Sequence, residues 1–510
     1  MESVKDNGKK KGGFEKFLAW LEMAGNKLPE PLTLFVWLAA IVIIISFIGS
    51  KAGFSAVHPL TQETIEVVNL FSASGLDQML SKAVSNFATF APLGLVLTCM
   101  LGVGLAEKTG MFSSLLRRSL ANTQGSKIVL VVIFASIMAN AAGDTGFIVM
   151  PPLAAMLFAA MGRNPLVGMM AAYAGVAGGF SANLIVNSLD VLVLGFTQSA
   201  ANLLDPDFIV NPACNWYFLI VSTFILTAVA TWVTVKIVEP RMGKGTYEVD
   251  KVEAVTQEEE KGLKAAGIAV VAYIALILVL AVPQNGFFRD SETKALLSSA
   301  APLMKGLVPL ITLLFFIPGY VYGRVAKKIQ SDKDTVAMLG QSMSEMGPYV
   351  VLSFVIAQFI NYFNWSNLGI ILAIKGADFL KNLGASAPVL LIGFIIISSL
   401  INLLVGSCSA KWAILSPIFV PMFMLLGFHP ALTQMAYRIG DSVTNVITPL
   451  LPYFAILVSF AKKYDKNIGM GTLIANMLPY TLAYFVIWTV QILIWYFLKL
   501  PLGPGSPLLL

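Results

Sequence analysis

Apolar runs long enough to cross a bilayer recur along this chain, and polar segments separate them. The first unbroken run covers about Pro31 to Ile48, close to the roughly 20 residues that a membrane-spanning helix needs. A polar stretch follows to about Ala88, and a second apolar run covers Phe90 to Leu105. These runs predict two membrane helices that are joined by an outer loop over residues 51–87.

The apolar stretch from Ile128 to Ile237 contains many residues that a continuous helix tolerates poorly. Proline removes a backbone donor, so repeated proline and glycine predict broken helices and a re-entrant hairpin. A second interrupted region, from Ala387 to Ser459, predicts a second hairpin. The interruptions in the first region are Gly143, Asp144, Pro151, Pro152, Gly162, Pro165, Gly178, Gly179 and Asn183.

The two interrupted regions share an ordered pattern. The segment Pro152–Pro165 has the same length as Pro417–Pro430, and Gly179–Asn183 resembles Gly440–Asn445 with one residue inserted. Basic residues between the apolar runs mark cytoplasmic loops. With that bias the segment from about Ala88 to Lys236 starts outside and ends inside, whereas the segment from about Met346 to Lys499 starts inside and ends outside. The pattern therefore predicts inverted repeats, which are typical of secondary transporters with a site near the midplane.

We therefore predict an all-α polytopic membrane protein with two inverted-topology repeats, broken helices and two re-entrant hairpins. The N-terminus has no signal-peptide core or cleavage site and is expected in the cytoplasm. The predicted parts are a cytoplasmic N-terminal segment (1–27), the first membrane helix with an outer loop (28–87), inverted repeat 1 (88–236), a cytoplasmic linker (237–265), two linking membrane helices (266–345, about Ala266 to Val282 and Val308 to Tyr322), inverted repeat 2 (346–500) and a C-terminal tail (501–510).

The composition agrees with a membrane protein. The chain of 510 residues is 57% hydrophobic and 12% charged, against roughly 25% charged residues in soluble domains. Two histidines and three cysteines are too few for a His-based metal centre or a disulfide framework. The net charge of +6 comes from bases between apolar runs, so it indicates topology and not a nucleic-acid partner. We expect no cofactor.

Five charged residues fall inside the interrupted apolar regions. A charge at bilayer depth costs at least about 2.5 to 3.5 kcal/mol, so each requires a partner or a water-filled cavity. Lys411 and Asp144 have an alternative, because a loop position would let them reach the membrane interface. The five are Asp144, Asp190, Lys411, Arg438 and Asp441.

Arg438 and Asp441 are three positions apart, which places them on one helix face within pairing distance. Two interpretations remain open. The pair is a structural salt bridge, or Asp441 alternates between Arg438 and a cation or proton while the Arg438 guanidinium binds a substrate carboxylate.

Small residues, hydroxyls and amides are concentrated in both predicted hairpins and in the broken helices beside them. Their oxygens suit a sodium ion, although membrane hydroxyls also join helices. Trp412 is either an interfacial anchor or a surface for stacking an aromatic substrate. The ion-binding candidates, for sodium or proton coupling, are Asn140, Asp144, Ser181, Asn183, Ser442 and Asn445.

Four ordered strings of this sequence are distinctive: Leu415–Pro430, Phe363–Asn367, Pro283–Gly286 and Asn215–Phe218. They resemble the AbgT family of p-aminobenzoyl-glutamate transporters, and the resemblance extends from about Leu28 to Pro504. It implies a dimeric bacterial inner-membrane protein with nine membrane helices, two hairpins, a scaffold domain and a transport core. It also implies uptake of p-aminobenzoyl-glutamate or export of sulfonamide-type antimetabolites, with the direction and the coupling ion left open.

The resemblance further implies that the chain is a transporter of a small anionic aromatic substrate and not an enzyme. The substrate-binding positions that it implies are Asp190, Asn402, Ser409, Trp412, Pro430, Arg438 and Asp441.

Two other classes of protein fit parts of this pattern. An intramembrane aspartyl protease would use Asp190 and Asp441, but Arg438 beside Asp441 would keep that carboxylate ionised, whereas a protease dyad shares a proton. A passive channel is the second alternative, although buried charges and two hairpins favour alternating access. A test of concentrative transport separates the channel from the transporter.

Overall fold

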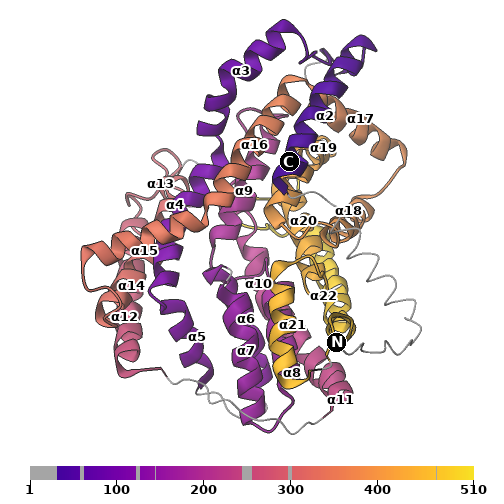
Figure 1. Ribbon diagram of the computed structural model, residues 1–510. Helices are drawn as coiled ribbons and strands as arrows, with labels where there is room; N and C mark the ends of the chain where they lie inside the picture. The colour runs from indigo at the N-terminus through magenta and orange to yellow at the C-terminus, as the bar shows by residue number, and fades with distance from the viewer. Residues whose placement is uncertain are drawn as a thin grey trace, which may run out of the picture.

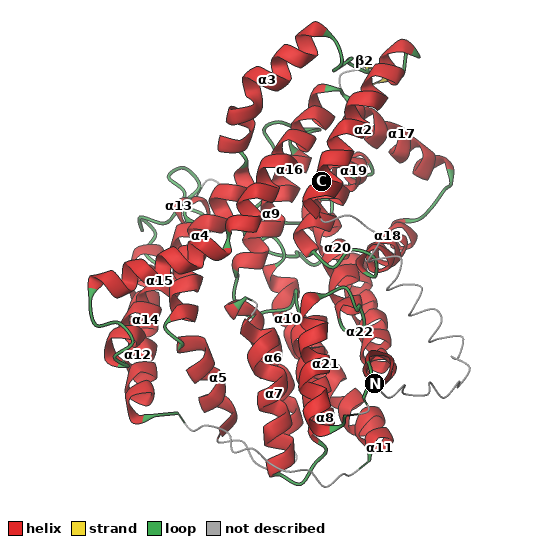
Figure 2. Cartoon of the chain, in the orientation of Figure 1, coloured by secondary structure: helices red, strands yellow, loops and turns green. Residues whose placement is uncertain are grey.

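The chain folds almost entirely into helices, as Figure 2 shows. A computed structural model describes residues 31–57, 63–121, 127–143, 145–243, 255–296, 301–466 and 468–510. The predicted segment 1–27 lies outside these residues, as does Asp144. The only sheet among the described residues is an antiparallel pair of short strands, β1 (Ser55–Val57) and β2 (Thr64–Glu66). The all-α class is confirmed.

The first predicted membrane helix is confirmed as α2 (Pro31–Lys51). The expectation of a loop over residues 51–87 is wrong for its second half, which forms α3 (Ala73–Ala88). The Ser72 hydroxyl begins this helix by accepting a hydrogen bond from the Gly75 amide at 3.1 Å. Polar residues interrupt the apolar positions of α3, so a search for continuous apolar runs misses it.

The second apolar run is confirmed as α4 (Ala91–Lys108), and α5 (Met111–Ala121) follows it. Helix α4 packs closely against α14 (Leu307–Val325). A Cβ atom built on Gly102 would lie 2.0 Å from the Thr312 carbonyl oxygen. Glycine at this position therefore sets the distance between the two helices.

The first interrupted region is broken into short helices, as predicted. Prolines 151 and 152 lie inside α7, and a π-helical turn ends α8. We call α6, the following 3-10 turn and α7 helix pair 1; it lies in the lower half of Figure 1. The elements are α6 (Ile128–Met138), the 3-10 turn (Ala139–Ala142), α7 (Thr145–Ala160), α8 (Pro165–Tyr173), the π-helical turn (Ala174–Gly178), α9 (Ser188–Ala201) and α10 (Trp216–Val233).

The charged linker predicted over residues 237–265 is partly helical. Its last residues form the start of α12. There the Glu259 backbone amide donates to Thr256 Oγ1 at 3.2 Å, and the Thr256 backbone amide donates to Glu259 Oε2 at 3.0 Å. Residues 244–254 lie outside the described part. The elements from α10 to the second half are a π-helical turn (Thr234–Val238), α11 (Glu239–Met242), α12 (Gln257–Ala281), α13 (Pro302–Lys305), α14 and α15 (Asp332–Glu345).

The second half contains one helix that the sequence pattern did not predict. Helix α17 lies where a mixed loop was expected, and it starts after Asn367, whose φ is +59°. Its Ile371 and Ile374 pack in a small core with Ala56 and Val67 of the β1–β2 hairpin region. We call α18 and α19 helix pair 2. The helices are α16 (Gly347–Trp365), α17 (Leu368–Asn382), α18 (Ala387–Asn402), α19 (Cys408–Leu425), α20 (Pro430–Asn445), α21 (Pro452–Tyr464) and α22 (Met470–Leu498).

Several helices are long and apolar enough to cross a membrane. The described residues contain seven of them, or up to eight if α15 and α16, which are bent by 45°, form one span. Large apolar side chains point outward along these helices, including Trp37, Val84 and Ile268. Such exposure is expected in contact with lipid, and the polytopic membrane class is confirmed.

The last ten residues, expected as a tail, are docked against the helices. The Leu502 carbonyl accepts a hydrogen bond from the Phe218 amide at 3.1 Å, and the Leu508 carbonyl accepts one from the His429 amide at 2.9 Å. Both leucines are buried. The tail thereby connects the start of α10 to the start of α20.

Candidate functional site

Helix α20 is at the centre of the site, and all of its 16 residues are buried. It is nevertheless polar, because Gln434, Arg438, Asp441 and Asn445 recur at spacings of three and four residues along it. Pro430 is its first residue, and His429 Nδ1 accepts a hydrogen bond from the Ala431 amide at 3.1 Å. Because a buried polar group without a partner is costly, every one of these side chains requires contacts from other elements.

Arg438 forms an ion pair with Asp190. Arg438 Nη1 lies 2.6 Å from Asp190 Oδ1, and Nη2 donates a hydrogen bond to the Ser181 carbonyl at 3.2 Å. The two side chains are 2% and 7% exposed. Among the described residues, Arg438 Nε has no acceptor. The guanidinium therefore keeps one donor for a further group.

Asp190 is held in place by the start of α9. Asn187 and Asp190 form a capping box, in which the Asn187 amide donates to Asp190 Oδ2 at 2.8 Å. The other carboxylate oxygen is then left for Arg438. The N-terminal end of a helix also favours a negative charge, which adds to the stability of this carboxylate.

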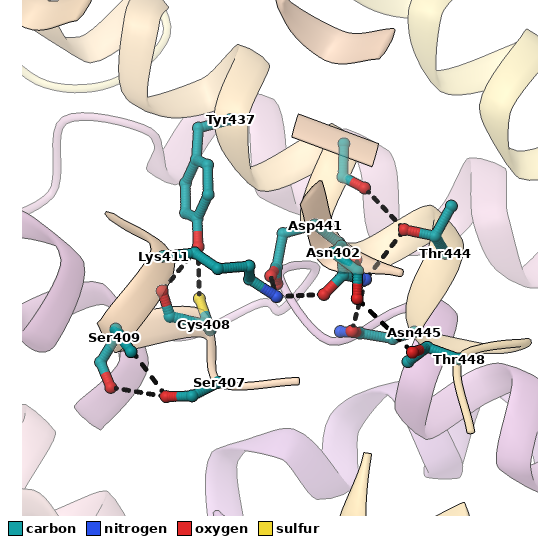
Figure 3. Close-up of polar contacts among 12 residues, drawn as sticks. Asn402, Ser407, Cys408, Ser409, Lys411, Tyr437, Asp441, Thr444, Asn445 and Thr448 are labelled. Atoms are coloured by element: carbon teal, nitrogen blue, oxygen red, sulfur yellow. Dashed lines mark hydrogen bonds and ion pairs between the residues drawn. The ribbon is translucent and has the colours of Figure 1, made fainter. Parts of the chain in front are cut away.

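Lys411 forms the second buried ion pair, with Asp441. Lys411 Nζ lies 2.6 Å from Asp441 Oδ1, and these side chains are 1% and 0% exposed. The same ammonium donates a hydrogen bond to Asn402 Oδ1, as Figure 3 shows. Lys411 is a buried residue of α19, whereas the alternative considered from the sequence was an exposed loop position.

Asn402, at the end of α18, connects helix pair 2 to α20. Its Nδ2 donates to the Asp441 carbonyl at 2.7 Å, to Thr444 Oγ1 at 2.8 Å and to Asn445 Oδ1 at 2.9 Å (Figure 3). Thr448 donates a hydrogen bond to the Asn402 carbonyl at 3.4 Å. The two N–H groups of Nδ2 are shared among these three oxygens, and the Asp441 carbonyl, which can only accept, fixes the orientation of the amide.

The expected pairing of Arg438 with Asp441 is wrong. The two residues lie on one helix, but each has its partner on another element, Asp190 for Arg438 and Lys411 for Asp441. A partner from a separate helix can approach a buried side chain directly, whereas neighbours on one helix meet only along its surface. Asp190 and Asp441 thus have separate basic partners, an arrangement unlike the shared proton of a protease dyad.

Trp412 is fully buried beside Lys411. Its ring stacks on Tyr437 of α20, with centroids 4.4 Å apart and planes inclined by 19°. Trp412 Nε1 donates to Thr197 Oγ1 at 2.9 Å. Ser409, three residues earlier in the chain, contacts Ser407 Oγ at 3.2 Å in the turn of helix pair 2. The indole is thus held by protein groups on its ring and on its nitrogen.

A hydrogen-bonded chain near Trp412 was not predicted from the sequence. Thr197 donates to Gln434 Oε1 at 2.6 Å, and Gln434 Nε2 donates to Asn215 Oδ1 at 2.7 Å. The sequence does contain a signal for Gln434. It precedes Arg438 by four positions, which predicts that it lies on the same face of the helix as Arg438.

The ion-binding candidates lie in two groups. Asn140 Nδ2 donates to the carbonyls of Val176 and Gly179 at 3.1 and 3.2 Å, which joins helix pair 1 to the π-helical turn after α8. Asn445 belongs to the Asn402 network. Buried polar atoms without a partner among the described residues include Asn140 Oδ1, Ser181 Oγ, Asn183 Nδ2 and Ser442 Oγ. Asp144 lies outside the described part.

Two cavities with shared lining residues lie near the Arg438–Asp190 pair, and the smaller one reaches it. The first, of about 10 Å³, is lined by both residues and by Gln434. The second, of about 230 Å³, is lined almost entirely by apolar side chains. Val186, Ala213 and Trp216 line both. The larger cavity exceeds the roughly 150 Å³ that accepts benzene in a protein interior. Within the described residues no group of three or more His, Cys, Asp or Glu side chains is placed to hold a metal ion.

This fold and site define a class of protein: a polytopic membrane protein with paired buried charges. Known proteins agree with it. The chain is 38% identical over 491 residues, 96% of each chain, to the p-aminobenzoyl-glutamate transport protein of Escherichia coli (strain K12). It also resembles the YdaH transporter of Alcanivorax borkumensis, with TM-score 0.90, 40% identity and coverage of 93% of this chain and 100% of that one.

A third relative is MtrF of Neisseria gonorrhoeae, described as belonging to a class of antimetabolite efflux pumps. Its structure gives a TM-score of 0.90 at 43% identity, covering 96% of this chain and 100% of that one. The model of the AbgT putative transporter family matches residues 16–510. The chain belongs to the AbgT family of transporters, and it is therefore a transporter and not an enzyme.

Proposed function

We propose that this chain is an ion-gradient-driven secondary transporter of p-aminobenzoyl-glutamate, related folate catabolites and sulfonamide-like antimetabolites, working by alternating access. The observation that carries the proposal is the position of Arg438 at a small cavity that shares lining residues with a larger apolar cavity. Its guanidinium has an unpaired Nε, and the neighbouring cavity of about 230 Å³ is large enough for an aromatic ring. An anionic aromatic molecule needs both features.

In this proposal the aryl group enters the apolar cavity near Trp216 and a carboxylate binds Arg438. The carboxylate uses the free Nε donor and competes with Asp190 for the positive charge of the guanidinium. The small cavity at the ion pair, of about 10 Å³, is too narrow for a carboxylate in this closed conformation. Binding therefore requires side chains to move, which is a feature of alternating access and not of an open channel.

The coupling ion is sodium or a proton, and the two hairpins are the proposed place of coupling. Helix pairs 1 and 2 support this assignment, because each contains a short apolar helix that is followed by a buried asparagine amide or ends in one. We infer that these pairs are re-entrant hairpins belonging to two inverted repeats. We further propose that the chain lies in the bacterial inner membrane with its N-terminus in the cytoplasm.

Flux in proteoliposomes tests the function. Radiolabelled p-aminobenzoyl-glutamate is supplied under an imposed sodium gradient, an imposed proton gradient or no gradient. Accumulation above the external concentration under either gradient supports the proposal. Equilibration that no gradient changes would leave the passive channel as the explanation. A sulfonamide supplied in the same assay tests the antimetabolite part of the substrate range.

Cysteine labelling tests the topology. Cysteines in place of Lys328, after α14, and Glu292, before α13, should be labelled from opposite sides of the membrane, the first from the cytoplasm. Labelling of both from the same side would remove the proposed topology. The proposed homodimer is tested separately by mass measurement of the detergent-solubilised protein.

A further inference from the structure

The ammonium of Lys411 lies between oxygens of the kind that bind hard cations. It contacts the Asp441 carboxylate at 2.6 Å and the Asn402 amide oxygen (Figure 3). Carboxylate and amide oxygens are the ligands that such ions prefer in proteins. Both charged side chains are at most 1% exposed, so water does not supply the ammonium with alternative partners.

The orientation of Asn402 is fixed by groups other than Lys411. Its Nδ2 lies 2.7 Å from the Asp441 carbonyl oxygen, which can only accept a hydrogen bond, so a rotated amide would place two acceptors against each other. The amide oxygen must therefore face the ammonium. A cation position is built into helix pair 2 and α20, and a side chain of the protein fills it.

Helix pair 1 has an asparagine in a comparable position. Asn140 lies in the turn after α6 and donates to the carbonyls of Val176 and Gly179, as Asn402 donates to α20. Its oxygen, Asn140 Oδ1, is buried and has no partner among the described residues. Nine positions after Asn402 stands Lys411, whereas nine positions after Asn140 stands Val149. One amide oxygen thus faces a positive charge and the other does not.

We propose that Lys411 is a tethered cation: its ammonium occupies the monovalent-cation position formed by Asp441 and Asn402, and so excludes sodium from helix pair 2. An exchangeable cation then uses the position near Asn140. The second statement rests on the proposed ion coupling, but the first concerns binding alone. Removal of the ammonium should convert the position into a sodium site.

The test uses the Lys411→Met variant, which keeps most of the side-chain volume and removes the charge. Sodium binding to the purified full-length protein is counted with radioactive ²²Na⁺. Thermal unfolding is followed in NaCl and in choline chloride of the same ionic strength. We expect one additional bound sodium per chain relative to the unaltered protein. We also expect a sodium-dependent rise of several degrees in the midpoint, since a ligand that binds only the folded state stabilises it.

Two control variants make the result specific. Lys411→Met/Asp441→Asn removes both charges and should bind no additional sodium. Lys333→Met, on the exposed face of α15, should behave like the unaltered protein. The proposal is overturned if Lys411→Met binds no more sodium than the unaltered protein, or if the double variant gains as much. It is also overturned if Lys411→Met fails to fold in sodium while the double variant folds, because sodium then does not replace the ammonium.

The binding count separates this proposal from the proposed function. If flux in proteoliposomes ignores sodium but Lys411→Met gains a sodium ion, the tethered cation stands and sodium coupling fails. If flux follows sodium but the variant gains none, sodium coupling stands and the tethered cation fails.

Discussion

Arg438 and Asp441 lie three positions apart on α20, yet each forms its ion pair with a different element of the protein. Arg438 meets Asp190 at the start of α9, and Asp441 meets Lys411 on α19. One helix thereby connects two separate parts of the molecule through charge. Replacing a buried ion pair by apolar residues is often harmless, but removal of one partner strands the other charge. Single and double substitutions therefore have different expected effects.

Arg438→Lys keeps the positive charge and loses the planar fork of the guanidinium. Substrate affinity should fall by about 1.5 to 3 kcal/mol if Arg438 binds the substrate carboxylate through this fork. Titration of detergent-solubilised protein with p-aminobenzoyl-glutamate measures the change. Expression and the unfolding midpoint are recorded alongside. Unchanged affinity in a well-folded Arg438→Lys variant would mean that Arg438 serves only to neutralise Asp190.

Asp441→Ala leaves the Lys411 ammonium buried without its carboxylate. We expect a loss of about 3 to 5 kcal/mol in the free energy of unfolding, seen as poor expression and a lower unfolding midpoint. Addition of Lys411→Met to this variant should restore most of the midpoint, because neither charge is then stranded. If the double variant is as unstable as Asp441→Ala, the ion pair is not the cause of the loss.

Trp412→Ala removes the ring that stacks on Tyr437 and the hydrogen bond to Thr197. It should lower the free energy of unfolding by about 3 to 5 kcal/mol, the usual cost of removing a large buried aromatic side chain. Trp412→Phe keeps a stacking ring and loses the hydrogen bond, so its cost should be near 1 kcal/mol. If Trp412→Ala lowers substrate affinity but leaves the unfolding midpoint unchanged, the ring stacks on substrate and not on Tyr437.

Gly102→Ala tests the close approach of α4 to α14. The added methyl would lie 2.0 Å from the Thr312 carbonyl oxygen, so the helices must separate. We expect a loss of about 1 to 3 kcal/mol in the free energy of unfolding. Gly94→Ala on the same helix is the matched control, since its Cβ has no neighbour within 4 Å. Equal effects of the two substitutions would show that helix propensity and not packing decides the result.

The length of an apolar run predicted a helix correctly where the helix is apolar without interruption. The pattern located α2 and α4 closely, because continuous apolar residues are what a bilayer requires. It missed α3 and α17, whose polar residues interrupt the run. Helix α17 takes its support from tertiary contacts with the β1–β2 region. The order of residues along the chain does not reveal such contacts.

The site residues were visible individually, but their partners were not. A charge in an apolar stretch marks Asp190, Lys411, Arg438 and Asp441 from the sequence alone. Pairing, however, depends on which helices meet, and α9 and α19 both approach α20 from distant parts of the chain. Spacing on one helix therefore favoured the pairing of Arg438 with Asp441. It gave no information on the ion pairs that these residues form with Asp190 and Lys411.

The docked C-terminal residues offer a position for a label that reports the movement of α20. The Leu510 amide donates to the Gly427 carbonyl at 3.0 Å, immediately before α20, while the Leu510 side chain is 58% exposed. A spin label or fluorophore on residue 510 therefore sits on a surface position that is tied to the buried helix by backbone bonds. Distances from such a label to one on α12 would report displacement of α20 during a transport cycle, without any change to the residues of the site.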